Sequence, residues 1–245
     1  MRLFGLIGHP LTHSFSKKYF TRKFEKEGLV DCQYELFPIG SIEEFPSLLE
    51  LNPDLEGINI TIPYKKKILS YLDSRDQVPA ALDACNCIHI KKGKLSGYNT
   101  DWTGFGKSLS PLLKTHHTKA LVLGNGGATA AVVYALKKLG IESTVVSRAI
   151  HEGSSITYND LGKKIIEENN IIVNTTPLGL YPHVEGAPEI PYQYITKQHL
   201  LYDLVYNPAK TLFLQKGEER GAMIKNGEEM LVIQAEESWK IWNNV

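Results

Sequence analysis

The feature that most constrains this chain is a cluster of glycines at residues 124–127, placed between an apolar run and an apolar stripe at helical spacing. The run, residues 120–123, is typical of a buried strand, and the stripe starts at Ala128. In a unit of strand, glycine loop and helix, backbone N–H groups and the positive end of the helix can hold a pyrophosphate. The order therefore predicts a Rossmann-like dinucleotide-binding domain, whereas a glycine cluster alone would also fit a structural turn.

We call residues 124–128 the glycine loop and expect it to contact the cofactor. The expected contacts are Gly124, Gly126, Gly127 and Ala128. Thr129 stands where the general fingerprint has its third glycine, which permits close packing of the helix against the strand. The helix must therefore accommodate a side chain at this position.

The residues after the next strand bear on the choice of cofactor. That strand, predicted at 144–147, ends at Ser147 and is followed by Arg148. An NAD site usually has an acidic residue here for the ribose hydroxyls, whereas a guanidinium matches a 2′-phosphate in charge and geometry. We therefore expect Ser147 and Arg148 to contact the cofactor and to favour NADP over NAD, although an arginine after a strand is often only a surface residue.

Along the whole chain, short β-rich runs alternate with helical periodicity, which predicts an α/β fold with mostly parallel strands. One helix should end at Gly28, and another should begin at Asp101 and be disturbed by Pro111. Residues 91–94 predict a hairpin turn. Strands are expected at residues 2–7, 32–37, 55–61, 86–90, 95–98, 120–123, 144–147, 171–174 and 200–204. The pattern predicts two α/β lobes with a junction near residue 100.

Composition narrows the classes of partner. Lys plus Arg and Asp plus Glu both number 27, so the net charge points neither to nucleic acid nor to an anionic membrane. The apolar opening is too short for a signal peptide, and no run of about 18 apolar residues predicts a membrane span. The 3 cysteines are too sparse for a disulfide framework. We therefore expect a cytoplasmic protein that binds neither nucleic acid nor a membrane.

A metal site is one alternative for part of the chain. Cys85, Cys87 and His89 would alternate along one face of a predicted strand. Structural zinc usually has four ligands from paired short motifs, and the sequence offers no partner pair. We therefore expect buried cysteines and no bound metal.

Polar residues gather in four segments of the first lobe, at residues 13–16, 59–65, 84–87 and 97–101. Asn59 and Thr61 share one face of a strand by period two, and Lys65 lies just beyond its end. Each segment also has a structural explanation, since Ser and Thr cap helices, Asn forms turns and Lys65 could be one of three solvated lysines.

Taken together and in order, these segments resemble the shikimate dehydrogenase family. The resemblance runs from Gly8 to Gln234 and includes the glycine loop. The matching motifs are His13, Ser14 and Ser16; Asn59, Thr61, Pro63, Tyr64 and Lys65; Asn86; and residues 99–101, 174–179, 203–208, 226–227, 230–231 and 234–235.

The resemblance implies a fold and an activity. The fold is a substrate-binding domain at residues 1–100, to which residues 228–245 return, and an NADP-binding Rossmann-like domain at 101–227. The activity is the reversible, NADPH-dependent reduction of 3-dehydroshikimate to shikimate, in the pathway to chorismate and the aromatic amino acids. The resemblance also implies a monomer or homodimer.

The resemblance implies roles for individual residues as well. Lys65 and Asp101 would be the catalytic pair. The residues around the substrate would be Ser14, Ser16 and Tyr206 at its carboxylate and Thr61, Asn86 and Gln234 at its hydroxyls. Thr175, Pro177 and Gly227 would lie near the nicotinamide and its ribose. Gln234 falls on a helical face with Ser238 and Trp242, where an unpaired amide would be costly and a core hydrogen bond is the alternative.

Some residues depart from the family pattern, and two other functions stay open. Lys17 stands where the family usually has Pro, Cys87 where it has Thr, and Ser147 and Ala149 where Asn and Thr are common. These changes affect loop geometry and recognition of the adenosine phosphate more than the catalytic pair. The alternatives are a quinate dehydrogenase that uses NAD and a non-catalytic sensor of the same ligands.

Overall fold

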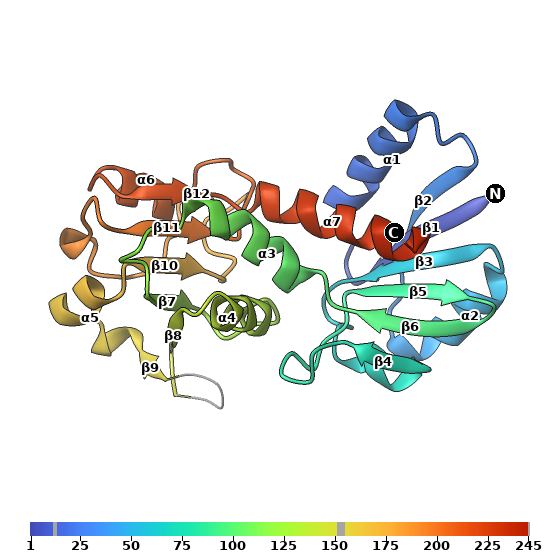
Figure 1. Cartoon of the computed structure of the whole chain (residues 1–245), viewed down its shortest axis with the longest axis horizontal. Helices are drawn as coiled ribbons and strands as arrows, with labels where there is room; N and C mark the ends of the chain where they lie inside the picture. Colours follow the sequence, from blue (N-terminus) through green and yellow to red (C-terminus); the bar gives the residue numbers. More distant parts are fainter. Residues whose placement is uncertain (12–13, 151–154, 245) are drawn as a thin grey trace. The chain divides into compact units, whose positions relative to one another are not determined.

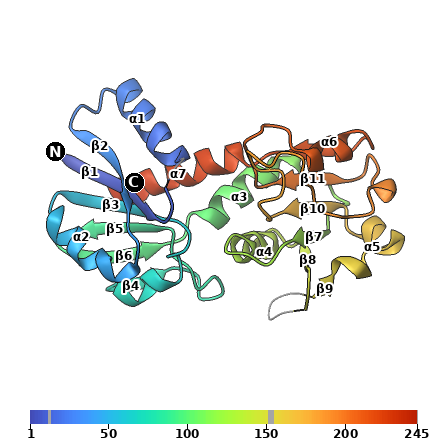
Figure 2. The same cartoon turned by 180° about the vertical axis from the view of Figure 1, so that it is seen from behind.

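The computed structural model describes residues 1–11, 14–150 and 155–244. The chain forms two compact units, each with its own six-stranded sheet (Figures 1 and 2). The first unit contains Met1–Thr100 and the segment that begins at Gln234, and the second contains Asp101–Ile233. The boundary therefore falls inside the last helix, α7 (Glu228–Asn243).

The sheet of the first unit has the order β2-β1-β3-β5-β6-β4. Its strands are β1 (Arg2–Gly8), β2 (Cys32–Pro38), β3 (Leu55–Ile60), β4 (Ser74–Gln77), β5 (Cys87–Lys91) and β6 (Lys94–Tyr98). Strands β1, β2 and β3 are parallel, whereas β5 runs antiparallel to both β3 and β6. The ends of β1, β3 and β6 and the start of β5 therefore meet at one edge of the sheet.

Helices cover both faces of this sheet. Residues of α1 (Phe15–Glu27) and α7 pack in one cluster, and residues of α2 (Phe45–Leu51) and of the 3-10 turn Lys67–Tyr71 pack in another. Helix α1 ends at Gly28, whose φ of 66° is left-handed, as predicted from the sequence. The hairpin predicted at 91–94 is also present, with positive φ at Lys92 and Gly93.

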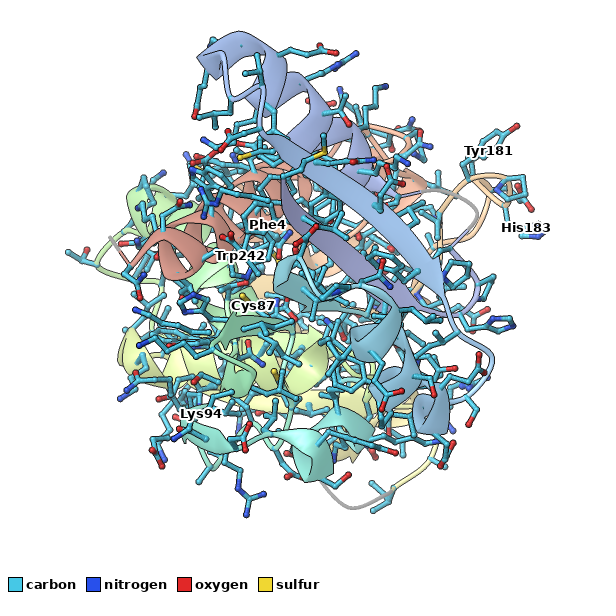
Figure 3. All side chains as sticks on the ribbon, turned by 90° about the vertical axis from the view of Figure 1, so that its right-hand side faces the viewer. Phe4, Cys87, Lys94, Tyr181, His183 and Trp242 are labelled. Carbon is cyan, nitrogen blue, oxygen red and sulfur yellow. The ribbon has the colours of Figure 1, made fainter. Side chains whose placement is uncertain are left out.

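Trp242 anchors the C-terminal part of α7 in the first unit. Its ring stacks on Phe4 with centroids 4.9 Å apart (Figure 3), and its Nε1 donates to the carbonyl of Ile88 at 3.0 Å. A Cβ at Gly57 would lie 2.3 Å from that Nε1, so the indole packs where a side chain is missing. A large buried aromatic ring with a satisfied N–H contributes strongly to such a core.

The sheet of the second unit is entirely parallel and has the order β12-β11-β10-β7-β8-β9. Its strands are β7 (Lys119–Leu123), β8 (Glu142–Ser147), β9 (Ile156–Thr157), β10 (Ile171–Asn174), β11 (Leu200–Asp203) and β12 (Met223–Lys225). Chain order along the sheet reverses between β7 and β10, as in Rossmann folds, which bind ligands beyond the carboxyl ends at this point. This confirms the predicted fold class.

Helices cover both faces of the second sheet, which explains the continuous apolar runs of its strands. Ala120 and Val122 pack with residues of α3 (Asp101–Leu109) and α4 (Thr129–Lys138), whereas Leu121 and Leu123 pack with α5 (Lys163–Glu168) and α6 (Leu212–Glu218). The remaining 3-10 turns are Ile42–Glu44, Ser110–Leu112, Tyr158–Asp160 and Tyr192–Tyr194. Within the described residues, no helix combines the length and apolar character needed to cross a membrane.

Candidate functional site

Polar residues of the first unit lie at one edge of its sheet. Ser14 follows β1, Thr61 follows β3, Asn86 precedes β5 and Thr100 follows β6. Because β5 is antiparallel to its neighbours, its start meets the ends of the other strands. The sheet topology thus gathers segments that are up to about 90 residues apart in sequence.

The two serines lie at the start of α1. Ser14 is its N-cap, and the Oγ accepts a hydrogen bond from the Lys17 backbone N at 3.2 Å. Ser16 hydrogen-bonds the hydroxyl of Tyr34, and burial raises the pKa of that tyrosine. Both serines are partly exposed, at the positive end of a helix, where a carboxylate is favoured. His13, the neighbour in the family motif, lies outside the described residues.

Lys65 lies in a turn after β3, as its spacing from the strand predicted. Its carbonyl accepts a hydrogen bond from the Cys85 backbone N at 2.8 Å. The preceding residue, Tyr64, is buried and its hydroxyl donates to the carbonyl of Ile39 at 2.7 Å. The backbone of this turn is therefore held from both sides, while the Lys65 side chain is half-buried.

Asn86 holds the residue that precedes Asp101. Its Oδ1 accepts from the backbone N of Thr100 at 2.6 Å, and its Nδ2 donates to the Thr100 Oγ1 at 3.0 Å. The Thr100 Oγ1 also donates to the Gln234 Oε1 at 3.5 Å, and all three residues are buried. The core hydrogen bond considered as an alternative for Gln234 is therefore present.

Tyr34 and Ser238, for which the sequence predicted no role, complete this buried network. The Tyr34 hydroxyl donates to Asn59 Oδ1 at 2.9 Å, and Asn59 Nδ2 donates to the Ser238 Oγ of α7 at 3.0 Å. Ser238 lies 3.4 Å from Thr100 Oγ1. The network thus joins β2, β3 and α7 to the segment that leads into Asp101. Polar residues within apolar stripes were the available signal for it.

The predicted zinc alternative rested on a geometry that the structure contradicts. Cys85 precedes β5 and packs in the cluster with α2, whereas Cys87 packs in the cluster with α1 and α7. The two cysteines therefore do not share a strand face, because the strand begins only at Cys87. Burial lowers the pKa of His89. Within the described part of the chain, no three His, Cys, Asp or Glu residues are grouped to hold a metal ion.

In the second unit, the glycine loop follows β7 at the point where strand order reverses. Gly124 has a φ of 108°, and a Cβ there would lie 2.9 Å from Thr175 Oγ1. Gly126 and Gly127 are exposed, and a Cβ on either would meet nothing within 4 Å. Ala128, the N-cap of α4, offers no side-chain cap, and the first turn has no acidic residue. This open backbone at a helix N-terminus fits a pyrophosphate.

Thr129, which stands at the position of the third glycine, is accommodated by hydrogen bonds of its side chain. Its side chain is buried, and its Oγ1 accepts from the Gly126 backbone N at 3.1 Å. The same oxygen lies 3.1 Å from the Gly124 carbonyl and 2.9 Å from the Thr175 Oγ1. The threonine therefore closes the glycine loop and ties it to the segment after β10.

Ser147 and Arg148 lie at the end of β8, beside this loop. The Gly124 backbone N donates to the Val146 carbonyl at 2.8 Å, which brings the two segments together. Ser147 is buried and its hydroxyl donates to the Ala149 carbonyl, whereas Arg148 is exposed. The Arg148 guanidinium is thus accessible to an anionic ligand.

The residues expected near the nicotinamide lie along the same edge, as does Tyr206, which is expected at the substrate carboxylate. Thr175 follows β10, and its N and Oγ1 donate to the Leu123 carbonyl at 2.9 and 2.8 Å. Pro177 is exposed, and Tyr206, after β11, is half-buried, which raises the pKa of its hydroxyl. A Cβ at Gly227 would lie 2.2 Å from the Leu204 carbonyl, so close backbone packing explains that glycine.

Comparison with known proteins matches both units. Residues 6–88 match the family model of the shikimate dehydrogenase substrate binding domain. A shikimate dehydrogenase (NADP(+)) of Clostridium beijerinckii is 37% identical over 254 residues, covering 99% of this chain and 92% of that protein.

Solved structures of shikimate dehydrogenases are also similar to this chain. The shikimate dehydrogenase of Aquifex aeolicus has a TM-score of 0.87 and 33% identity, covering 100% of this chain and 93% of that one. A shikimate 5-dehydrogenase of Thermus thermophilus, solved in complex with NADP(H) and shikimate, has a TM-score of 0.87 and 29% identity, covering 100% and 94% of the two chains.

Proposed function

Since the chain belongs to the shikimate dehydrogenase family, we propose that it catalyses the reversible, NADPH-dependent reduction of 3-dehydroshikimate to shikimate. This reaction belongs to the pathway to chorismate and the aromatic amino acids. The observation that carries the proposal is the 37% identity to an NADP-dependent relative over 99% of the chain, which includes the polar edge of the first sheet and the glycine loop.

Lys65 and Asp101 form the proposed catalytic pair. NADPH, when bound, supplies the hydride. The carbonyl oxygen that becomes a hydroxyl needs a proton and a nearby positive charge, which a lysine ammonium provides. Support comes from adjacent residues of one segment: Cys85 holds the backbone of Lys65, and Asn86 holds Thr100, the neighbour of Asp101. Asp101 would orient the lysine and bind the substrate hydroxyls.

Most of the proposed substrate contacts lie at the polar edge of the first sheet, whereas Tyr206 follows β11 of the second. Ser14 and Ser16, with Tyr206, would bind the carboxylate, because small hydroxyl donors at a helix N-terminus suit an anion. The residues proposed for the ring hydroxyls are Thr61, Asn86 and Gln234. Asn86 is held in place at this edge, because its Oδ1 and Nδ2 both bind Thr100.

The proposed cofactor contacts lie on the second sheet. The backbone of Gly124, Gly126, Gly127 and Ala128 would hold the pyrophosphate. Ser147 and Arg148 would face the adenosine ribose and its 2′-phosphate. Thr175, Pro177 and Gly227 would lie near the nicotinamide ribose and ring.

The proposal extends to the setting of the enzyme. We propose a cytoplasmic monomer or homodimer that acts on small molecules and needs neither nucleic acid nor a membrane. The balanced charge of 27 basic and 27 acidic residues supports this, as does the lack of a disulfide among the described residues.

The test is the absorbance of the reduced nicotinamide, with shikimate and quinate each offered NADP and NAD. We expect the highest kcat/KM for shikimate with NADP. A higher kcat/KM for quinate with NAD would instead identify a quinate dehydrogenase. Intact NADP binding without turnover of either substrate would identify a non-catalytic sensor.

A further inference from the structure

Asp203, the last residue of β11, is a buried carboxylate with no part in the proposed reaction. Its side chain is fully buried. Its Oδ1 accepts from the Asn174 Nδ2 at 2.9 Å and from the Val205 backbone N at 3.0 Å, and its Oδ2 accepts from the Thr211 Oγ1 at 2.6 Å. All three donors are neutral, and burial raises the pKa of the carboxyl to about 6. A carboxylate in this environment is costly, which calls for an explanation beyond packing.

The first donor connects Asp203 to the segment after β10. Asn174 uses its Nδ2 for Asp203, and its Oδ1 accepts from the backbone N and the Oγ1 of Thr176, at 3.0 and 2.6 Å. The Thr176 Oγ1 in turn accepts from the Leu178 backbone N at 3.3 Å. This chain of bonds fixes residues 174–178, which include the proposed nicotinamide contacts Thr175 and Pro177.

The other two donors connect Asp203 to the segment after β11. Val205 immediately precedes Tyr206, the proposed carboxylate contact. Thr211 is the N-cap of α6, and its Oγ1 accepts from the Leu214 backbone N at 3.4 Å. The carboxylate therefore binds both ends of the segment 205–211.

We propose that Asp203 is a positioning residue that holds the cofactor segment 174–178 and the substrate segment 205–211 in fixed relation at the carboxyl edge of the second sheet. The proposal rests on the proposed function, because that function assigns Thr175 and Tyr206 their ligands. One acceptor with three donors can fix two segments at once, which an apolar side chain of similar size cannot do. The three hydrogen bonds that Asp203 accepts thus explain why a buried acid is present at this position despite its cost.

Two substitutions separate geometry from charge. Asp203→Asn keeps Oδ1 for both N–H donors, and its Nδ2 can donate to the Thr211 hydroxyl, which is also an acceptor. Asp203→Leu removes all three bonds. A displacement of about 1 Å can cost ~10²-fold in rate, so we expect Asp203→Leu to lower kcat and raise the KM for NADP and shikimate, each by roughly 10- to 100-fold. In Asp203→Asn, the kcat, the KM for NADP and the KM for shikimate should all stay close to those of the unchanged protein.

Tyr202→Phe is the matched control. Tyr202 precedes Asp203 on β11, is fully buried, and its hydroxyl lies 2.7 Å from the Ser108 Oγ on α3. Its removal also breaks a buried hydrogen bond, but neither segment is attached to it. We expect a lower melting temperature with unchanged kcat and KM values.

Thr176→Val gives a milder test that does not depend on a buried site. It deletes the two side-chain bonds of a half-buried residue, one to Asn174 and one from the Leu178 backbone N, and leaves the bonds of Asp203 in place. It should raise the KM for NADP while leaving the KM for shikimate unchanged. Calorimetric titration of each variant with NADP measures its affinity for the cofactor without turnover.

Failure of the unchanged protein to turn over shikimate while it binds NADP would refute the proposed function alone. Unaltered NADP affinity in both Asp203→Leu and Thr176→Val, or losses that match those of Tyr202→Phe, would overturn the positioning role.

Discussion

In the first unit, hydrogen bonds between buried side chains hold the polar edge in place, whereas the glycine loop of the second unit is shaped mainly by its backbone. Asn59, Asn86 and Thr100 join strands of the first sheet to α7. The glycine loop instead depends on a left-handed Gly124 and on open backbone at Gly126 and Gly127. The difference matches the ligands: a ring with several hydroxyls needs directed side chains, and a pyrophosphate needs backbone N–H groups.

If the first unit supplies the chemistry, losing its lysine should have the largest effect. We expect Lys65→Ala to lower kcat by about 10²- to 10⁴-fold, because the transition state loses a proton donor and a positive charge. The melting temperature should hardly change, since substitutions on partly exposed turns cost about 0.5 kcal/mol or less. The adjacent, exposed Lys66→Ala is the control. Near-normal kcat in Lys65→Ala would remove this residue from the mechanism.

If the second unit distinguishes NADP from NAD, Arg148→Asp should lower kcat/KM with NADP and change kcat/KM with NAD much less. A hydrogen bond to a charged group contributes about 1.5–3 kcal/mol, so kcat/KM with NADP should fall roughly tenfold or more. The same charge change at Lys164, which is exposed on α5, should leave kcat/KM with both cofactors unaltered. An equal loss with NADP and NAD would mean that Arg148 is structural.

Substitutions at Thr129 test whether the glycine loop depends on the hydroxyl of this residue. Thr129→Gly restores the general fingerprint but removes the hydroxyl that links Gly126 and Thr175. A neutral hydrogen bond contributes about 0.5–1.5 kcal/mol, so we expect the Kd for NADP to rise about 2- to 10-fold. Thr129→Ser should bind NADP normally, and tighter binding by the glycine variant would contradict this account.

The smallest expected effect concerns pH and Asp203, a buried acid of the second unit. The Asp203 pKa of about 6 in the folded protein exceeds the ordinary value of about 3.9 expected in the unfolded chain. Between these values the folded state binds more protons, so this group reduces stability as pH rises from about 4 to about 6. The melting temperature of Asp203→Asn, relative to the unchanged protein, should therefore increase over that window. A constant difference would argue against the raised pKa.

Within each unit, the strands differ in how well the sequence predicts them. Buried strands such as β7 and β10 were predicted because apolar runs next to glycine or polar residues carry a local signal. The short strands β4, β9 and β12 were not predicted, because two to four residues at or near a sheet edge show no periodicity. Fold class followed from the order of the longer elements.

Candidate site residues can be identified from the sequence where they belong to a local motif, as at the glycine loop, and their roles remain predictions. The roles of Tyr34 and Ser238 could not be predicted, since their bonds join residues 25 and 179 positions away from Asn59. The prediction that Cys85 and Cys87 share a strand face was wrong, because Cys85 precedes β5 and packs in a different cluster from Cys87. Long-range contacts and exact strand starts are what sequence periodicity leaves open.

The central proposal is that Lys65 and Asp101 act together in the proton transfer. The most direct measurement is a double-mutant cycle on kcat for shikimate oxidation with Lys65→Ala, Asp101→Asn and the double variant. Residues that act as a unit are strongly non-additive, so the double variant should be far less impaired than the product of the two single effects. Full additivity of the two losses would contradict the claim.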